Sequence, residues 1–371
     1  MSTIHDYLAS VPLVDHHCHY LIKASAPNRA KRLAQVSTEA DNAYPLSDTK
    51  NRLAWHAFID EANRRAIDPQ APLRDLTDAE YATYNQRVFG HYRFTDLFID
   101  TGFVPDDPIL DLAETAKLTG TRVHAIYRIE THAETWLDQT DNFNDWFDGL
   151  AGQVAAAKAN GYVGFKSIAA YRFGLRLTNP TQAEAVAAYN QWRASGINRL
   201  TSPTLISYIL WQLAPTLAAQ HMPLQFHVGY GDADTDLFEG NPLLLRPFLQ
   251  EFCPQGLPVV LLHCYPYHKE AGYLASVFPN LYFDISLIDN LGPHSVPRVL
   301  DEALDLAPYS RFLFASDAST YAEMYAVGAR TFKQALAQHL DSLDYISEAQ
   351  KQTWCDMICH GNAERLYLHK A

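Results

Sequence analysis

The chain has 371 residues, a length that allows either two ordinary domains or one α/β barrel of ~250 residues with a large insertion. Hydrophobic residues make up 48% of the sequence and charged residues 19%, which excludes a mainly disordered chain. The 29 basic and 42 acidic side chains give a formal net charge of −13. This acidity argues against broad contact with nucleic acid or with an anionic membrane, because both need a basic surface.

The cysteine content indicates the compartment. Few and scattered cysteines are typical of reduced intracellular thiols rather than of a secreted disulfide framework. The segment Met1 to Pro12 has no basic leader before an apolar run, and no stretch reaches ~18 consecutive apolar residues. We therefore expect a cytoplasmic protein without an export signal or membrane span. The five cysteines are Cys18, Cys253, Cys264, Cys355 and Cys359.

Short apolar runs bounded by turn residues recur along the chain. They are mostly continuous rather than alternating in polarity, as expected for strands that are buried on both faces. There are eight of them, at residues 12–15, 96–100, 122–127, 162–166, 223–227, 258–263, 281–285 and 311–315.

Helical stretches separate most of these runs, as at 143–159, 181–194 and 324–340. Strand and helix therefore alternate, which calls for a parallel sheet with helical crossovers. Eight units predict a closed (β/α)8 TIM barrel that occupies the whole chain, 1–371, in one domain. A doubly wound open sheet is the alternative.

The region 21–93 fits no strand pattern. Its composition is helical and polar, with stretches at 49–67 and 78–89. A segment that follows a barrel strand emerges at the rim where active sites form, so this insertion after strand 1 could lie over the mouth as a lid. A helical insertion that only enlarges the core is the alternative.

The first strand ends in a histidine-rich segment, 15–19, which reads Asp-His-His-Cys-His. His17 and His19 are two residues apart, so on an extended chain both imidazoles project from one face and can share an ion. His16 is expected to point the opposite way, as a packing or supporting residue.

Four further polar residues follow later strands: Lys166 after the fourth, His227 after the fifth, His263 after the sixth and Asp317 after the eighth. Taken singly, each has a structural explanation, such as a satisfied core histidine or an aspartate that caps a helix. Together they are matched for a divalent metal, because the C-terminal ends of barrel strands meet at one rim. Imidazole and carboxylate ligands suit Zn²⁺ especially, with Mn²⁺, Fe²⁺ or Co²⁺ as alternatives.

This pattern resembles the amidohydrolase superfamily, which carries His-x-His on strand one, Lys or another bridging ligand on strand four, His on strands five and six, and Asp on strand eight. The segment 165–172, Phe-Lys-Ser-Ile-Ala-Ala-Tyr-Arg, is similar to the "amidohydrolase 2" group, which includes domains fused to glutamine-synthetase-like modules. The segment 361–367 resembles the C-terminal helix of that family. The resemblance covers nearly the whole chain and implies a metal-dependent hydrolase.

The state of Lys166 separates two forms of the site. A buried lysine with a lowered pKa can take up CO₂ to form a carbamate, and the resemblance implies that this carboxylysine bridges two ions. One ion would lie on His17, His19 and Asp317, and the other on His227 and His263. If Lys166 stays unmodified, it is a cation beside a single metal, and His263 transfers or orients a proton.

The expected reaction is metal-assisted hydrolysis of an amide, lactone or ester of a small, anionic substrate. A bound metal lowers the pKa of water and polarises the carbonyl, while Asp317 accepts a proton and passes it to the leaving group. Two alternatives remain on the same scaffold, a decarboxylase and a sugar-acid isomerase, although such relatives generally lack the strand-four lysine. The third alternative is a catalytically inert metal-binding module. Such a module is expected to have lost ligands, and none of the expected ligands is missing from this sequence. The sequence leaves the oligomeric state open, a homo-oligomer included.

Candidate substrate-binding residues follow the third, fourth and sixth strands. A guanidinium offers a fork that matches a carboxylate or a phosphate. Pairing with neighbouring acids is the alternative for each arginine. The candidates are Arg128, Tyr171, Arg172, Tyr265 and His268.

Overall fold

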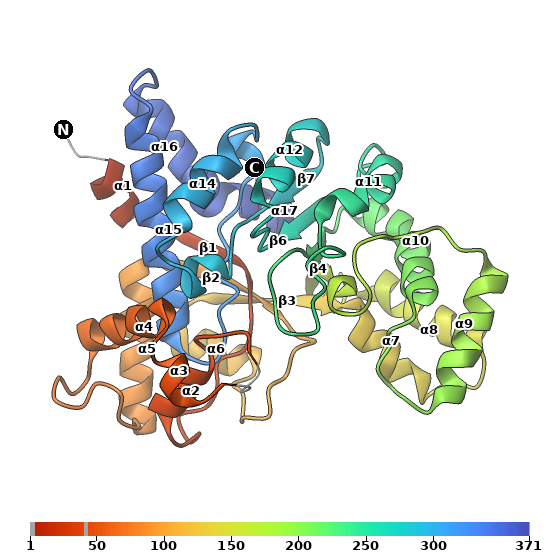
Figure 1. Cartoon of the computed structure of the whole chain (residues 1–371), viewed down its shortest axis with the longest axis horizontal. Coiled ribbons are helices and arrows are strands. Elements are labelled where there is room, and N and C mark those ends of the chain that lie inside the picture. Colours follow the sequence, from red (N-terminus) through yellow and green to blue (C-terminus); the bar gives the residue numbers. More distant parts are fainter. Residues whose placement is uncertain (1–3, 41–43, 371) are drawn as a thin grey trace.

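The computed structural model describes residues 4–40 and 44–370. Seven parallel strands form one sheet, hydrogen-bonded in sequence order from β1 to β7. The sheet is curled and flanked by helices (Figure 1), which confirms the α/β barrel class. The strands are β1 (Leu13–Cys18), β2 (Phe94–Asp100), β3 (Arg122–Arg128), β4 (Tyr162–Ser167), β5 (Leu224–His227), β6 (Val259–Leu262) and β7 (Leu281–Phe283).

The eighth predicted strand, 311–315, takes its expected place between β7 and β1 but forms no regular ladder. Leu313 N donates to Phe283 O at 3.0 Å, and His16 N donates to Phe314 O at 3.3 Å. The pairing is interrupted at Ser316, whose N–H donates to the Asp15 carboxylate at 3.0 Å, and resumes where Asp317 N donates to His17 O at 3.0 Å. The prediction of a regular strand is therefore wrong here, whereas its position is right, and the segment still joins the two edges of the sheet.

Helices connect consecutive strands and cover the sheet. In Figure 1, α2 to α6 gather on one side of the sheet, and α7 to α9 gather on the other. The helices are α1 (Ile4–Ser10), α2 (Arg29–Gln35), α3 (Leu46–Thr49), α4 (Leu53–Arg65), α5 (Asp78–Tyr92), α6 (Leu112–Thr119), α7 (Ile129–Leu137), α8 (Phe143–Ala156), α9 (Gln182–Ser195), α10 (Pro203–Gln220), α11 (Arg246–Phe252), α12 (His268–Val277), α13 (Ile288–Leu291), α14 (Val296–Leu304), α15 (Ala322–Ser342), α16 (Glu348–Asp356) and α17 (Asn362–Leu368).

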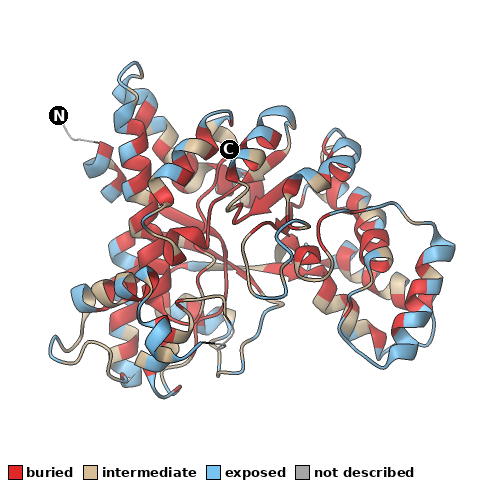
Figure 2. Cartoon of the chain, viewed as in Figure 1, coloured by how far each residue is buried: buried red, intermediate tan, exposed pale blue. Residues whose placement is uncertain are grey.

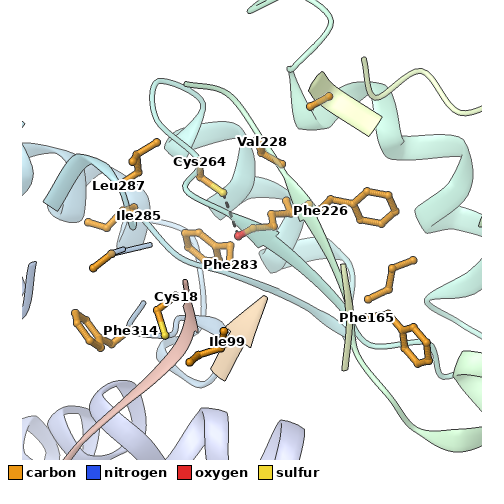
Figure 3. Packing of buried hydrophobic residues seen from close by; sticks show 14 of the residues in the cluster. Cys18, Ile99, Phe165, Phe226, Val228, Cys264, Phe283, Ile285, Leu287 and Phe314 are labelled. Atoms are coloured by element: carbon orange, nitrogen blue, oxygen red, sulfur yellow. Dashed lines mark hydrogen bonds between the residues drawn. The ribbon is translucent and has the colours of Figure 1, made fainter. Parts of the chain in front are cut away.

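Buried apolar side chains form two clusters, one on each face of the strands. The larger cluster fills the space between the strands and the helices, and Figure 3 shows Phe165, Phe226 and Val228 within it. The smaller cluster lies inside the barrel, where residues such as Leu366 and Tyr367 of α17 pack against inward-facing strand side chains. The chain's last helix therefore closes the bottom of the barrel.

The alternation of strand side chains then dictates what lies above this plug. Gln225 of β5 faces inward and donates to the Tyr367 hydroxyl at 2.8 Å, so His227, two residues later, faces inward one layer higher. On β4, Gly164 lies so close to the plug that a Cβ would stand 3.1 Å from the Tyr367 ring. Lys166 follows two residues later. Strand periodicity alone therefore places both groups at the mouth of the barrel.

The insertion between β1 and β2 contains α2 to α5, and the helices expected at 49–67 and 78–89 are present as α4 and α5. Residues 41–43 of the predicted insertion lie outside the described residues. Arg29 of α2 forms a buried ion pair with Glu323 of α15, the helix that follows Asp317. Figure 2 shows the faces of α4, α5 and α15 that meet one another as buried. The insertion is thus packed onto the barrel through α15.

The cysteines and the helices bear on the expected compartment and on the expected absence of a membrane span. All five cysteines are free and buried, as predicted for reduced thiols. Within 4–40 and 44–370, no helix combines the length and the apolar character needed to cross a membrane.

Candidate functional site

Asp317 lies at the centre of the predicted metal-binding residues. His17 Nε2 and His19 Nε2 each stand 3.1 Å from the same oxygen, Asp317 Oδ1. His263 Nε2 lies 3.8 Å from the second oxygen, Oδ2. The side chain of Asp317 is 12% exposed. Residues separated by some 300 positions in the sequence therefore meet at one point, as the strand-end pattern predicts.

His227 completes the imidazole group. Its ring lies 4.6 Å from the ring of His263, measured between centroids, and 4.1 Å from the ring of Tyr171. His227 is buried, and its Nε2 has no hydrogen-bond partner among the described residues. The structure thus brings His227 to the same site as the other histidines.

The ring of His263 is fixed from behind. Ser286 Oγ donates to Asp284 Oδ1 at 2.6 Å, and Ser286 Oγ lies 2.7 Å from His263 Nδ1. Since the serine proton goes to the aspartate, the serine oxygen accepts from His263 Nδ1–H. The lone pair of a neutral His263 ring then sits on Nε2, which faces Asp317.

A further carboxylate arranges the neighbouring backbone. Asp15 accepts from Ser316 N at 3.0 Å and from Ser316 Oγ at 2.5 Å. Asp317 itself adopts a left-handed backbone conformation, with φ of 51°, and its N–H donates to His17 O at 3.0 Å. These bonds hold Asp317 against β1. The His16 imidazole points elsewhere, with Nε2 2.9 Å from Asp284 Oδ2, which agrees with its expected supporting place.

Lys166 reaches this site from β4. Its Nζ lies 2.9 Å from His17 Nε2 and 3.4 Å from Asp100 Oδ2. Asp100, at the end of β2, also accepts from the guanidinium of Arg128, at 3.0 Å from Nε to Oδ2. Arg128 is therefore engaged by an acid, the alternative left open by the sequence, although it also lines the cavity described below.

Burial sets the protonation of the site. It lowers the pKa of His263 to about 4 and the pKa of His17 and His227 well below the usual value, and the Lys166 cation adds to this effect. Burial raises the pKa of Asp317, but the surrounding histidines outweigh it and hold that pKa well below its usual range. The site therefore favours the neutral imidazoles of His17, His227 and His263 around an ionised Asp317.

These groups fit a divalent cation. Two sets of ligand atoms lie within 4.8 Å of one another, one from His17, His263 and Asp317 and one from His17, His19 and Asp100. His263 Nε2 and His227 Nε2 are buried without hydrogen-bond partners among the described residues. Neutral imidazole nitrogens beside a carboxylate are the ligands that Zn²⁺ prefers. The donor set and its unpaired nitrogens both match such an ion.

A cavity of about 440 Å³ opens above these residues. Its wall includes Tyr171 and Arg172, which follow β4, and four residues of the insertion, Gln35, Val36, Thr38 and Glu39. The side chain of Arg172 is 9% exposed and pairs through Nη2 with Glu134 Oε1 at 3.0 Å, while its Nε has no partner among the described residues. The lining therefore combines predicted metal residues, three arginines (Arg128, Arg172 and Arg199) and part of the insertion.

Tyr265 and His268, also predicted to touch substrate, lie elsewhere. Neither is among the described residues that line the cavity. Their rings stack on each other at 6.0 Å between centroids, and His268 Nε2 is 2.7 Å from Glu302 Oε2. The structure thus places His268 against α14 and stacks Tyr265 on it.

Three residues of the site were not predicted from the sequence: Asp100 as a candidate ligand, and Ser286 and Asp284 as the groups that hold His263. Asp100 ends β2 in the same way that Lys166 ends its run, so the rule used for the other strands would have found it. Ser286 and Asp284 follow a three-residue strand and carry no motif of their own.

Three comparisons place the chain among known proteins. A family model described as "Amidohydrolase" matches residues 14–368. A solved structure from Lactobacillus casei ATCC 334 bears the description of a metal-dependent hydrolase. Its sequence is 59% identical to this chain, its TM-score is 0.98, and the match covers 100% of this chain and 98% of that one.

Two more distant relatives are similar to this chain, one in sequence and one in fold. Protein fluG of Emericella nidulans is 26% identical over 99% of this chain, which spans only 47% of that protein. The uronate isomerase of Thermotoga maritima has a TM-score of 0.69 at 13% identity, with coverage of 98% of this chain and 96% of that one. This last likeness shows the fold alone.

Replacing Ser286 with alanine should weaken zinc binding by roughly 10- to 100-fold, because the partner that fixes the His263 ring is lost. Zinc affinity by competition with a chelator measures the effect. Ser276→Ala is the matched control, since that exposed hydroxyl donates only to Tyr273 O. Equal zinc affinity in the Ser286→Ala protein and the control would show that this hydrogen bond does not orient a ligand.

Proposed function

The chain belongs to the amidohydrolase family, and from this premise we propose that it is a metal-dependent hydrolase of a small anionic amide, lactone or ester. The observation that carries the proposal is the meeting of His17, His19 and His263 at the two oxygens of Asp317. Zinc is the proposed metal, because neutral imidazoles and one carboxylate form the donor set.

When bound, the ion would polarise the scissile carbonyl and lower the pKa of water from 15.7 to ~7. Asp317 would take the proton of the attacking water on Oδ2, the oxygen with only the longer contact to His263, 3.8 Å away. The same carboxyl would then donate that proton to the leaving group. His263, whose ring is fixed by Ser286 on its far side, would present its Nε2 lone pair to the ion beside Asp317.

Lys166 decides between one ion and two. Burial lowers the pKa of its amine, which favours the neutral form that takes up CO₂. As a carbamate it would join two ions, one near His17 and His19 and one near His227 and His263. As an ammonium it would pair with Asp100, 3.4 Å away, beside a single ion.

We propose Arg172 as the residue that binds the anionic group of the substrate. Arg128 Nε already donates a hydrogen bond to Asp100. Arg172 Nε has no partner among the described residues, and the Arg172 side chain lines the cavity. A buried guanidinium with an unused N–H gives a strong, directed hydrogen bond to a carboxylate. Tyr171, adjacent in the chain, would pack against the substrate beside His227.

The insertion is proposed as the roof of this site. Its residues 35–39 contribute four side chains to the cavity wall. Arg29, on the same helix as Gln35, is tied to Glu323 in the first turn of α15. An insertion held in this way can exclude water from the reacting groups.

Turnover in ¹⁸O-labelled water tests the proposal. The zinc-loaded protein, offered a panel of anionic lactones, esters and amides, should place one solvent oxygen in the new carboxylate of the product. Release of CO₂, or rearrangement of a sugar acid without a new carboxyl group, would instead establish the decarboxylase or isomerase alternative.

In the same assay Asp317→Asn should lose turnover while zinc largely remains, and full activity in that variant would refute its role in proton transfer.

Metal stoichiometry tests the role of Lys166. With a carbamate bridge, the protein should hold about two zinc ions, and Lys166→Ala should lose the second, because the bridging anion is gone. Elemental analysis after gel filtration in bicarbonate buffer gives the count. An unchanged stoichiometry in Lys166→Ala would exclude the bridge and leave the single-ion form.

A further inference from the structure

A second cavity, of about 240 Å³, lies between α1, α4, α5 and α15. Lys333 of α15 lines it, and its Nζ donates to Val11 O at 2.9 Å and to Tyr92 O at 3.3 Å. Both carbonyls precede the first residues of β1 and β2, Leu13 and Phe94. The cavity therefore lies at the N-terminal ends of the strands, opposite the rim that carries Asp317.

Basic side chains dominate the wall of this second cavity. They come from four helices, and among the described residues that line it there is no carboxylate. This contrasts with the chain as a whole, whose formal net charge is −13. The basic residues are Arg64, Arg65, Arg330 and Lys333, together with His5 and His91.

The two carboxylates behind the wall do not balance this charge. Asp60 is shared between Arg64 Nε at 2.9 Å and Arg330 Nη1 at 2.6 Å. Glu61 is shared between Arg65 Nε at 3.1 Å and Arg330 Nη1 at 3.3 Å. Counted over these described residues, three guanidinium groups and the Lys333 ammonium stand against Asp60 and Glu61, an excess of two positive charges.

Backbone carbonyls occupy Lys333 but, in the contacts of the described residues, not Arg64 or Arg65. The carbonyls at the C-terminal end of α4 accept from Arg87, whose Nη1 donates to Arg65 O at 3.1 Å and to Ala66 O at 3.2 Å. The carbonyl of Tyr92, the last residue of α5, is taken by Lys333. Arg64 therefore keeps N–H groups for a ligand. Arg65 is held by Glu61 and by Tyr92, to which its side chain is also hydrogen-bonded, with Cζ 5.6 Å from the Tyr92 ring centroid.

The protonation of His91 reports the same local charge. Burial lowers the pKa of His91, and the nearby cations Arg65 and Lys333 lower it further, against the opposing effect of Glu61. A histidine pKa lowered by neighbouring cations indicates a region of positive potential.

We propose that this second cavity binds a small dianion of the phosphate or phosphate monoester class. An excess of two positive charges matches the charge of such a group near neutral pH, and guanidinium forks fit its oxygens in a bidentate manner. A volume of about 240 Å³ accommodates a phosphate with a short carbon chain. The site is separate from the barrel mouth, and the inference does not depend on the proposed hydrolase activity.

Calorimetric titration of the zinc-loaded, full-length protein with inorganic phosphate tests this site, with chloride at equal ionic strength as the reference. We expect saturable binding of one phosphate at this site. Arg64→Gln should weaken it about tenfold, the effect of losing one charge-assisted hydrogen bond, and Lys333→Gln should weaken it as well. The Arg64 side chain is 57% exposed, so its replacement leaves the core intact. Lys269→Gln is the control, because that ammonium is 62% exposed and pairs with Glu302.

Arg172→Gln separates the two cavities. It should leave this phosphate affinity unchanged, since Arg172 lines the barrel mouth. The inference is overturned if phosphate produces no saturable heat beyond chloride, if Arg64→Gln binds as tightly as the unmodified protein, or if Arg172→Gln alone abolishes binding.

Discussion

The site depends on one largely buried carboxylate, Asp317, that is surrounded by imidazoles instead of by a permanent cation of its own. Burial alone would favour its protonated form, yet the histidines hold its pKa well below the usual range. The same burial keeps His17, His227 and His263 neutral. Unpaired ring nitrogens beside a charged oxygen are costly in a dry interior unless a cation satisfies them, so this arrangement calls for a metal ion.

The barrel makes that arrangement possible. Inside it, α17 forms an apolar plug, and Tyr367 of this helix also accepts from Gln225 at 2.8 Å. Because strand side chains alternate, the next inward position on each strand stands above the plug, where His227 and Lys166 lie. A site built on strands in this way is held rigidly, and its chemistry is open to change through the loops that follow. Here those loops contribute Arg172 and the residues of the insertion.

Much of this could be predicted from the sequence, and for a physical reason. Buried parallel strands read as continuous apolar runs, and a polar residue that ends such a run lies at the rim, which located His227, His263 and Asp317. The eighth strand is irregular because its pairing with β1 is interrupted at Ser316, which bonds to the Asp15 side chain, a contact that no local pattern reveals. Ser286 acts through tertiary contact alone. Tyr265 and His268 failed to reach the cavity because following a strand does not fix where a side chain points.

Diffraction from zinc-grown crystals, measured on both sides of the zinc absorption edge, tests the central claim most directly. The account predicts an anomalous peak at the barrel mouth, within ~2.0–2.2 Å of imidazole nitrogens and of a carboxylate oxygen. His17 and Asp317 should be among its ligands. Zinc found only on the acidic surface, with these side chains still in contact with one another, would contradict it.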